Sequence, residues 1–360
     1  AFWDNRLYLD FTYYKTDSRN QILKLATTAA SGYTSQVRNA GHIRNRGYEI
    51  QLGAVPIQTS KGFRWNLDLN YGANSSKVVK LDDEGLITSY QLYSSGIQIL
   101  ASVGEAYGTL FGTSYVRDAN GNVVVDANGL PKISTTNKTL GKFTPDWTGG
   151  ISNTFSYRSL SLSFLIDASV GGSIFSNTNK TGKYTGVLAN TLSGRDAEHG
   201  GLWYYTDAMG NNVRLPESPS YSVSSDGLYY AQVNGQSTRV YQDGIMVEGV
   251  TESGSKNEEV VSAEKYYHRI YSIAEANVYD ASYVKLREVA LSYRLPRLWT
   301  QKLHLQEASV TLTGRNLWTI YKSVPNIDPE SALTTGNAQG VEAYSLPTTR
   351  SFGVNLSVKF

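Results

Sequence analysis

The chain has 360 residues, of which 18% are charged, and a formal net charge of +2. This near balance gives no electrostatic reason to expect nucleic-acid binding, and the lack of cysteine excludes disulfides, thiolate metal sites and cysteine nucleophiles. No run of about 18 apolar residues occurs, which excludes transmembrane helices but not a transmembrane β-barrel, because half of each barrel strand is polar. The 26 Tyr and 6 Trp suit membrane–water interfaces and also sugar or peptide binding.

Alternation of apolar and polar residues with period two predicts eight strands. In chain order they lie at about 7–13, 48–52, 63–71, 151–157, 160–170, 283–294, 308–313 and 352–360. The apolar parity changes inside 283–294, which predicts a β-bulge near Arg287 and Glu288.

The last predicted strand is the clearest. Its apolar positions fall on every second residue, and they are Phe352, Val354, Leu356, Val358 and Phe360. A C-terminal strand that ends on an aromatic residue is typical of bacterial outer-membrane barrels, so we interpret these five residues as a C-terminal barrel signal. The chain starts at Ala1 with neither an initiator Met nor a basic-plus-apolar leader, and we expect it to be a mature or C-terminal portion of a longer protein.

The connections between the predicted strands alternate between short and long. Those at about 54–62, 158–159 and 295–307 are short, and those at about 18–40, 77–146, 171–282 and 319–349 are long. An antiparallel barrel with short periplasmic turns and long outer loops has this alternation. We therefore interpret 77–146 and 171–282 as extracellular loop regions. Four such loops would crowd the mouth of a closed eight-stranded barrel, so we expect one arc of a larger, all-β antiparallel transmembrane barrel.

The strand parity also predicts which residues face the inside of the barrel. We expect the polar positions to line a wet lumen, and the charged ones are Asp10, Glu49, Asp68, Asp167 and Arg315. For Arg315 two interpretations stay open, lining the lumen or pairing with a neighbouring acid.

The longest predicted loop carries an aromatic cluster. Its members are Trp203, Tyr204, Tyr205, Tyr229 and Tyr230. Flat aromatic rings bind sugar rings and peptide side chains well. We expect these residues either to contact substrate or a partner's lid, or to pack against one another.

No catalytic, metal or cofactor site is predicted. The four histidines, at 42, 199, 268 and 304, share no metal-ligand spacing. The segment 118–129 begins like an EF-hand loop, but Val123 takes the place of the required Gly and Gly129 that of the Glu. We interpret its Asn-Gly pairs at 120–121 and 128–129 as two tight turns.

Several segments resemble SusC/RagA-type TonB-dependent transporters. They are Asp280-Ala-Ser-Tyr-Val-Lys-Leu-Arg-Glu-Val-Ala-Leu-Ser-Tyr-Arg-Leu-Pro296, Gly314-Arg-Asn-Leu-Trp-Thr-Ile-Tyr-Lys322, Asn326-Ile-Asp-Pro-Glu330, Arg44-Asn-Arg-Gly-Tyr-Glu-Ile-Gln-Leu52 and the closing Ser351-Phe-Gly-Val-Asn-Leu-Ser-Val-Lys-Phe360. The similarity runs from the first strand to the last residue and is weakest across 171–265.

The resemblance implies a 22-stranded barrel in the outer membrane of a Gram-negative, Bacteroidetes-like bacterium, in contact with outer-membrane lipid. It implies import of oligosaccharides or peptides, a SusD-like surface lipoprotein as lid, and energy from the TonB complex. Relative to that pattern, residues 1–360 correspond to the C-terminal barrel portion and lack the N-terminal plug, the TonB box and about fourteen strands. The remaining N-terminal plug and barrel portion is therefore itself an expected partner, and this chain alone should not transport.

Two other functions remain open on the sequence. A small outer-membrane barrel enzyme would need a compact acid/base group at its rim, and adjacent carboxylates such as Asp82-Asp83-Glu84 do not form one. A soluble secreted all-β binding module would need a second sheet that buries the outward apolar rows.

Overall fold

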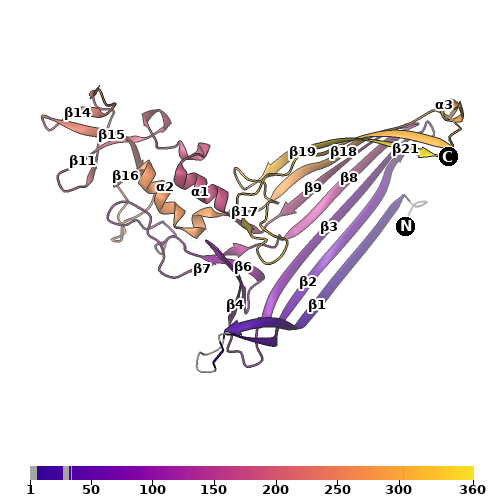
Figure 1. Ribbon diagram of the computed structural model, residues 1–360, viewed down its shortest axis with the longest axis horizontal. Coiled ribbons are helices and arrows are strands. Elements are labelled where there is room, and N and C mark those ends of the chain that lie inside the picture. The colour runs from indigo at the N-terminus through magenta and orange to yellow at the C-terminus, as the bar shows by residue number, and fades with distance from the viewer. Residues whose placement is uncertain (1–5, 27–31, 34, 303) are drawn as a thin grey trace.

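A single eight-stranded antiparallel sheet dominates the computed structural model, which describes residues 6–26, 32–33, 35–302 and 304–360. Its strands follow one another in chain order (Figure 1). They are β1 (Leu7–Ala26), β2 (Ser35–Gln58), β3 (Phe63–Lys80), β8 (Trp147–Tyr157), β9 (Leu160–Val170), β18 (Tyr283–Arg294), β19 (Glu307–Lys322) and β21 (Ser351–Lys359). All eight predicted strands are confirmed, as is the antiparallel all-β class. The expectation drawn from Ala1 lies outside the described residues.

The strand pairing keeps apolar residues on one face across the sheet. Direct cross-strand neighbours share a face, and one apolar row is Leu9, Leu52, Leu69, Ile151, Ile166 and Leu286. In β18 the register shifts between Leu286 and Glu288, as predicted for the bulge. The extra residue restores the apolar parity, so Leu291 again lies opposite Leu162.

The predicted loop at 18–40 is wrong for the described part of that segment. β1 and β2 continue as a paired hairpin of 20 and 24 residues, with Leu25 opposite Gln36. Period-two alternation appears only where apolar residues keep to one face, and in this stretch apolar residues such as Ile22 and Leu23 fall on both parities. Its strand character therefore comes from backbone pairing that continues beyond the apolar part of the hairpin.

The other long connections carry structure of their own and gather at the end of the sheet opposite the C-terminus (Figure 1). Residues 77–146 form a four-stranded sheet, residues 171–282 hold further strands and two helices, and residues 319–349 add one short strand. Their elements are β4 (Ser89–Ser94), β5 (Gln98–Ser102), β6 (Tyr107–Gly112), β7 (Lys138–Lys142), β10 (Ser173–Ser176), α1 (Asn177–Thr185), η2 (Ala189–Thr191), η3 (Ala197–His199), β11 (Leu202–Thr206), β12 (Asn212–Arg214), β13 (Tyr221–Val223), β14 (Tyr229–Val233), β15 (Gln236–Met246), β16 (Val260–Ser262), α2 (Ala263–Tyr271), η4 (Ala274–Asn277), β17 (Val278–Asp280) and β20 (Val341–Glu342).

The short connections lie at the other end of the sheet. Arg158 and Ser159 join β8 to β9 in a two-residue turn, as predicted, and α3 (Arg297–Lys302) lies between β18 and β19. Arg158 adopts a positive φ of 54°, the left-handed conformation that tight hairpins require.

Helices α1 and α2 were not predicted. α1 begins where the Ser176 side chain accepts a hydrogen bond from the Asn179 amide and ends at Gly186, whose φ is +69°. α2 is capped in the same way by Ser262, which accepts from the Lys265 amide. Each helix has nine residues, too few for periodicity to distinguish it from a loop.

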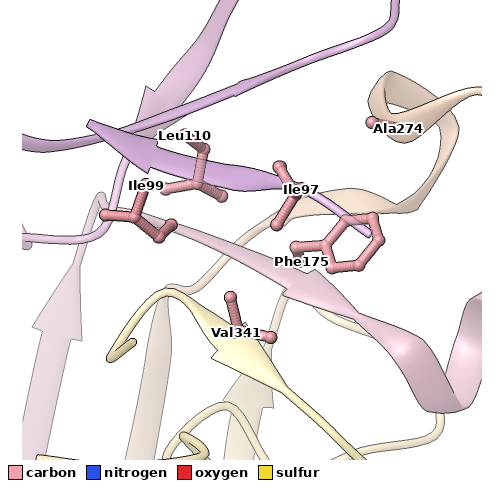
Figure 2. Close-up of a cluster of buried hydrophobic side chains, with 6 residues drawn as sticks. All are labelled: Ile97, Ile99, Leu110, Phe175, Ala274 and Val341. Carbon is pink, nitrogen blue, oxygen red and sulfur yellow. The ribbon is translucent and has the colours of Figure 1, made fainter. Parts of the chain in front are cut away.

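Three long connections share one hydrophobic core (Figure 2). Ile97, Ile99 and Leu110 come from residues 77–146, Phe175 and Ala274 from residues 171–282, and Val341 from residues 319–349. Strand β10 supports this core because it pairs with β17 and, in parallel, with β20. The three connections therefore form one packed body rather than separate loops.

Within the part of the chain that the structure describes, no helix is long and apolar enough to cross a membrane.

The apolar face can be tested with a charge. Ile151 lies mid-sheet between Leu69 and Ile166 and is 40% exposed. If this face meets lipid, Ile151→Arg in the complete protein should cost about 2–4 kcal/mol of folding free energy. The neighbouring Ser152→Arg, on the opposite face beside Asp68, should cost much less. The measurement is folded yield and thermal unfolding of both variants in lipid bilayers, and equal losses would contradict a lipid-facing surface.

Candidate functional site

The first functional feature is the apolar face itself. Its side chains are open in this structure, with Leu9, Leu312 and Leu356 exposed by 60%, 51% and 65%. The five residues of the predicted C-terminal signal are also exposed, and Phe352, Val354 and Leu356 pair with positions of β19 on this face. Soluble monomers rarely leave an apolar surface this extensive uncovered.

The opposite face collects the predicted lumen residues. Cross-strand pairing puts Asp10, Gln51, Asn70, Gly150 and Asp167 in one row, and alternation adds Glu49 and Asp68. Arg315 joins the same face through its partner Glu288, with 2.9 Å between Nε and Oε2. The arrangement in which Arg315 pairs with an acid is thus the one observed. That this face lines a lumen stays a prediction.

A buried ion-pair network holds the last long connection onto this face. The Lys285 ammonium contacts Asp328 Oδ1 at 2.6 Å and Glu330 Oε2 at 2.5 Å. Arg287 donates to Asp167 Oδ2 at 2.7 Å and to Glu330 Oε2 at 2.8 Å. Two segments that resemble the transporter family, 280–296 and 326–330, therefore meet at these charges.

The electrostatics of the network favour its charged form. Burial alone would raise the pKa of Asp328, but hydrogen bonds from Lys285 and Thr348 outweigh burial and lower that pKa to about 2. Burial alone would also raise the pKa of Glu330, but hydrogen bonds from Arg287 and Lys285 hold that pKa below its usual value. Asp328 therefore contributes stability above its unfolded pKa of about 4, and this contribution is lost as the pH falls toward 2.

Removing the central cation should be costly. The Lys285 side chain is 3% exposed and that of Asp328 is 8% exposed, so Lys285→Met leaves the buried Asp328 carboxylate without its cation, whereas Glu330 keeps its contact with Arg287. We expect a loss of about 3–5 kcal/mol, seen as a lower thermal midpoint of the detergent-purified complete protein. The double variant Lys285→Met/Asp328→Asn should regain part of the lost stability, because it no longer has an unpaired buried carboxylate at position 328. Lys142→Met, which breaks the exposed pair with Asp146, should cost less than about 1 kcal/mol, and equal losses for the two lysines would contradict this account.

Ion pairs also join the long connection 77–146 to the long connection 171–282. Arg269 of α2 contacts Asp126 at 3.0 Å, and Arg117 contacts Glu275 at 3.0 Å. Val124 pairs in parallel with Val250. These contacts build the walls of a cavity between segments that are distant in sequence.

That cavity has a volume of about 720 Å³. Its lining includes Tyr115 and Pro131 from residues 77–146, Tyr266 and Tyr267 of α2, and Gly244 of β15. Tyr267 is fixed because its hydroxyl donates to the Asn190 and Ser193 carbonyls at 3.1 and 3.2 Å. Aromatic walls with a few fixed polar groups are the usual composition of a ligand site.

Lys183 of α1 supplies the cation of this cavity. It is only 9% exposed, and its ammonium donates to the Ala276 carbonyl at 2.7 Å and to Asn277 Oδ1 at 3.3 Å. Both acceptors are neutral, and among the described residues no carboxylate forms an ion pair with Lys183. Burial lowers the pKa of Lys183 to about 8. An ammonium has three donors, and beyond these two acceptors the Lys183 nitrogen also lies over the Tyr279 ring, 5.3 Å from its centroid.

The predicted aromatic cluster is divided by the structure. Trp203 is buried, stacks on Tyr221 with ring centroids 5.0 Å apart, and contacts Tyr229 edge-on at 5.8 Å. Tyr204 is buried too and donates to Asp243 at 3.1 Å. For these residues the rings pack together, the second of the two interpretations. Tyr205 and Tyr230 stay partly exposed, and contact with substrate or lid remains a prediction for them.

The segment 118–129 forms the two predicted turns. Asp118 Oδ1 accepts from the Asn120 and Asn122 amides at 2.9 and 2.8 Å, and Asp126 Oδ1 accepts from the Asn128 amide at 2.9 Å. The carboxylates are used by their own backbone, as in Asx turns.

Comparison with known proteins shows what the chain resembles. It is 27% identical over 389 residues to TonB-dependent receptor P3 of Formosa agariphila and 24% identical over 388 residues to TonB-dependent receptor P26 of the same organism. Each alignment covers 100% of this chain and 33% of the relative. The chain resembles TonB-dependent receptors along its whole length. The resemblance inferred from the sequence is thereby confirmed, although no family model matches.

The fold agrees with that of solved transporters. Structures of the RagAB peptide transporter, and of the RagAB peptide importer in its closed-closed state, superpose with TM-scores of 0.60 and 0.61 at 18% and 19% identity. Each covers 99% of this chain and 34% of the other. The chain thus spans about one third of the length of the TonB-dependent receptors P3 and P26 and of these transporter chains.

Sequence reasoning missed the residues of the cavity. Lys183, Tyr115 and Tyr267 lie on three separate segments, and no spacing links them. The available signals were the Ser262 cap before the Tyr266-Tyr267 pair and the Gly186 that ends α1, which mark helices but not what those helices enclose.

Proposed function

We propose that this chain forms part of the wall and the outer body of a TonB-dependent importer in the outer membrane of a Bacteroidetes-like bacterium. The observation that carries the proposal is the open apolar face that runs across the eight strands, with charged and polar residues on the other face. The whole-length similarity to TonB-dependent receptors supports it. The apolar face contacts outer-membrane lipid, and Asp10, Glu49, Asp68, Asp167 and Arg315 face the lumen.

The body built from 77–146, 171–282 and 319–349 lies on the extracellular side in this proposal. It shapes the space in which an oligosaccharide or peptide is captured, and it docks a SusD-like lipoprotein lid. The similar RagAB structures are of a peptide transporter, which favours a peptide. The plug and the remaining strands come from the rest of the protein, through which the TonB complex supplies energy. No bond is made or broken.

The alternatives are less well supported. A soluble binding module needs a second layer over the apolar rows, whereas the described residues leave Leu9, Leu162 and Leu356 exposed. A barrel enzyme would have its chemistry at the rim, where the described charges form structural ion pairs such as Arg287 with Asp167.

The proposal is tested with the complete transporter in its host. We expect the tagged protein in the outer-membrane fraction together with a surface lipoprotein, and uptake of labelled oligosaccharides or peptides that stops when the proton-motive force is collapsed. A deletion strain should lose this uptake. Recovery of a fully active protein from the soluble fraction would overturn the assignment.

The cavity gives a pH-dependent test. If a carboxylate of the substrate binds Lys183, uptake of a labelled peptide with a free C-terminus should fall as the pH rises through about 8, because the amine loses its charge. Lys183→Met should lower uptake about tenfold, the order expected for one charge-assisted hydrogen bond, and remove this pH dependence. Lys180→Met on the same helix, where the ammonium lies over the Tyr271 ring at 4.2 Å, is the matched control. An unchanged pH profile in Lys183→Met would contradict a role for its charge.

A further inference from the structure

A band of tyrosines ends the apolar face toward the long connections. Tyr13 lies directly opposite Tyr48, with ring centroids 6.4 Å apart, and Tyr71 lies opposite Ile50. In β3 the apolar parity runs from Phe63 to Tyr71, about nine residues, which is the length of a membrane-crossing strand. Tyrosines at such a boundary belong at the membrane–water interface.

Basic residues occupy the next positions on the same face. Lys15 lies opposite Arg46, each two residues beyond the tyrosine of its strand, and Arg44 lies opposite Lys77 on the following row. We call Lys15, Arg44, Arg46 and Lys77 the basic cluster. Two residues of strand advance by about 6–7 Å, which moves these side chains from the depth of the tyrosine rings to that of lipid headgroups.

The positive charge of the basic cluster is only partly neutralised by acidic residues in the described structure. Like charges directly opposite each other destabilise a sheet, and here two such pairs are adjacent. The one acid among them, Asp17, contacts Arg44 at 2.8 Å and His42 at 2.5 Å. The described residues provide no ion pair for Lys15, Arg46 or Lys77, and all three side chains are exposed. The arrangement is complementary to an external anion.

We propose that the basic cluster binds the phosphate group of an outer-leaflet glycolipid, of the lipid A type. The inference rests on the proposed function for the membrane position of the sheet. The acyl chains of the lipid lie along the rows that end in Tyr13 and Tyr48, while Arg and Lys donate charge-assisted hydrogen bonds to phosphate oxygens. The long connections place this end of the strands on the outer side, where the phosphates of that leaflet lie.

The experiment uses the complete transporter purified from outer membranes in detergent, stripped of lipid, and then titrated with lipid A while bound lipid is counted by native mass spectrometry. The test variant is Lys15→Gln/Arg46→Gln/Lys77→Gln. Each cation near an anionic surface contributes about fivefold, so we expect its affinity for lipid A to fall about a hundredfold. The control variant is Lys61→Gln/Arg64→Gln/Arg158→Gln, which makes the same charge change at the short-turn end and should bind like the wild type.

Two further arms identify the ligand. Dephosphorylated lipid A should bind the wild type as weakly as lipid A binds the test variant. Equal affinity of both variants for lipid A would overturn the proposal, as would full displacement of lipid A by millimolar inorganic phosphate, which would indicate a site for a free anion. Loss of the lipoprotein lid with unchanged lipid binding would also overturn it and indicate a protein-docking surface.

Lipid A binding tests the lipid site, whereas membrane location and substrate uptake test the proposed function. A transporter that is found in the outer membrane and imports substrate, but binds lipid A equally in both variants, refutes only the lipid site. A protein that is not in the membrane refutes the proposed function. Unchanged thermal midpoints of the two variants in detergent would show that both are folded.

Discussion

The structure depends on cross-strand register. Because side chains alternate along each strand and direct partners share a face, a slip of one residue in any pair would move a whole set of apolar residues to the polar face. The pairing keeps Leu9, Leu52, Leu69 and Ile151 in one row. Where β18 changes parity, the bulge between Leu286 and Glu288 absorbs the extra residue. One continuous apolar surface and one continuous polar surface follow from this constraint.

A second level of organisation is built on the end of this sheet. The hydrophobic core around Phe175 joins three connections that are far apart in the chain. The buried carboxylate of Glu342 strengthens the junction, because it accepts hydrogen bonds from Ser176 at 2.7 Å and from Thr178 at 2.6 Å at the start of α1. The charges of Lys285 and Arg287 then attach the 326–330 segment to the sheet. The ion pairs of Arg269 with Asp126 and of Arg117 with Glu275 join the segments that line the cavity of Lys183.

The two levels correspond to two physical tasks in the proposed importer. The sheet separates lipid from water, which requires regular alternation and little else. The packed body presents Lys183, Tyr115 and Tyr267 from different segments around one space, which requires specific tertiary contacts. The basic cluster lies at the boundary between them, where Tyr13 and Tyr48 give way to Lys15 and Arg46.

The eight strands, the bulge, the two-residue turn at Arg158 and the face on which each strand residue lies could all be predicted from the sequence. The reason is that period-two alternation is a local property of strands with one apolar face. The sequence did not reveal that β1 and β2 continue through much of the predicted loop at 18–40, since apolar residues such as Ile22 and Leu23 fall on both parities there and no alternation remains. Three features could not be predicted in this way: Trp203 packs against Tyr221, Asp328 pairs with Lys285, and Lys183 lies in a cavity. Those outcomes depend on which distant segments meet, and no local pattern of residues records that.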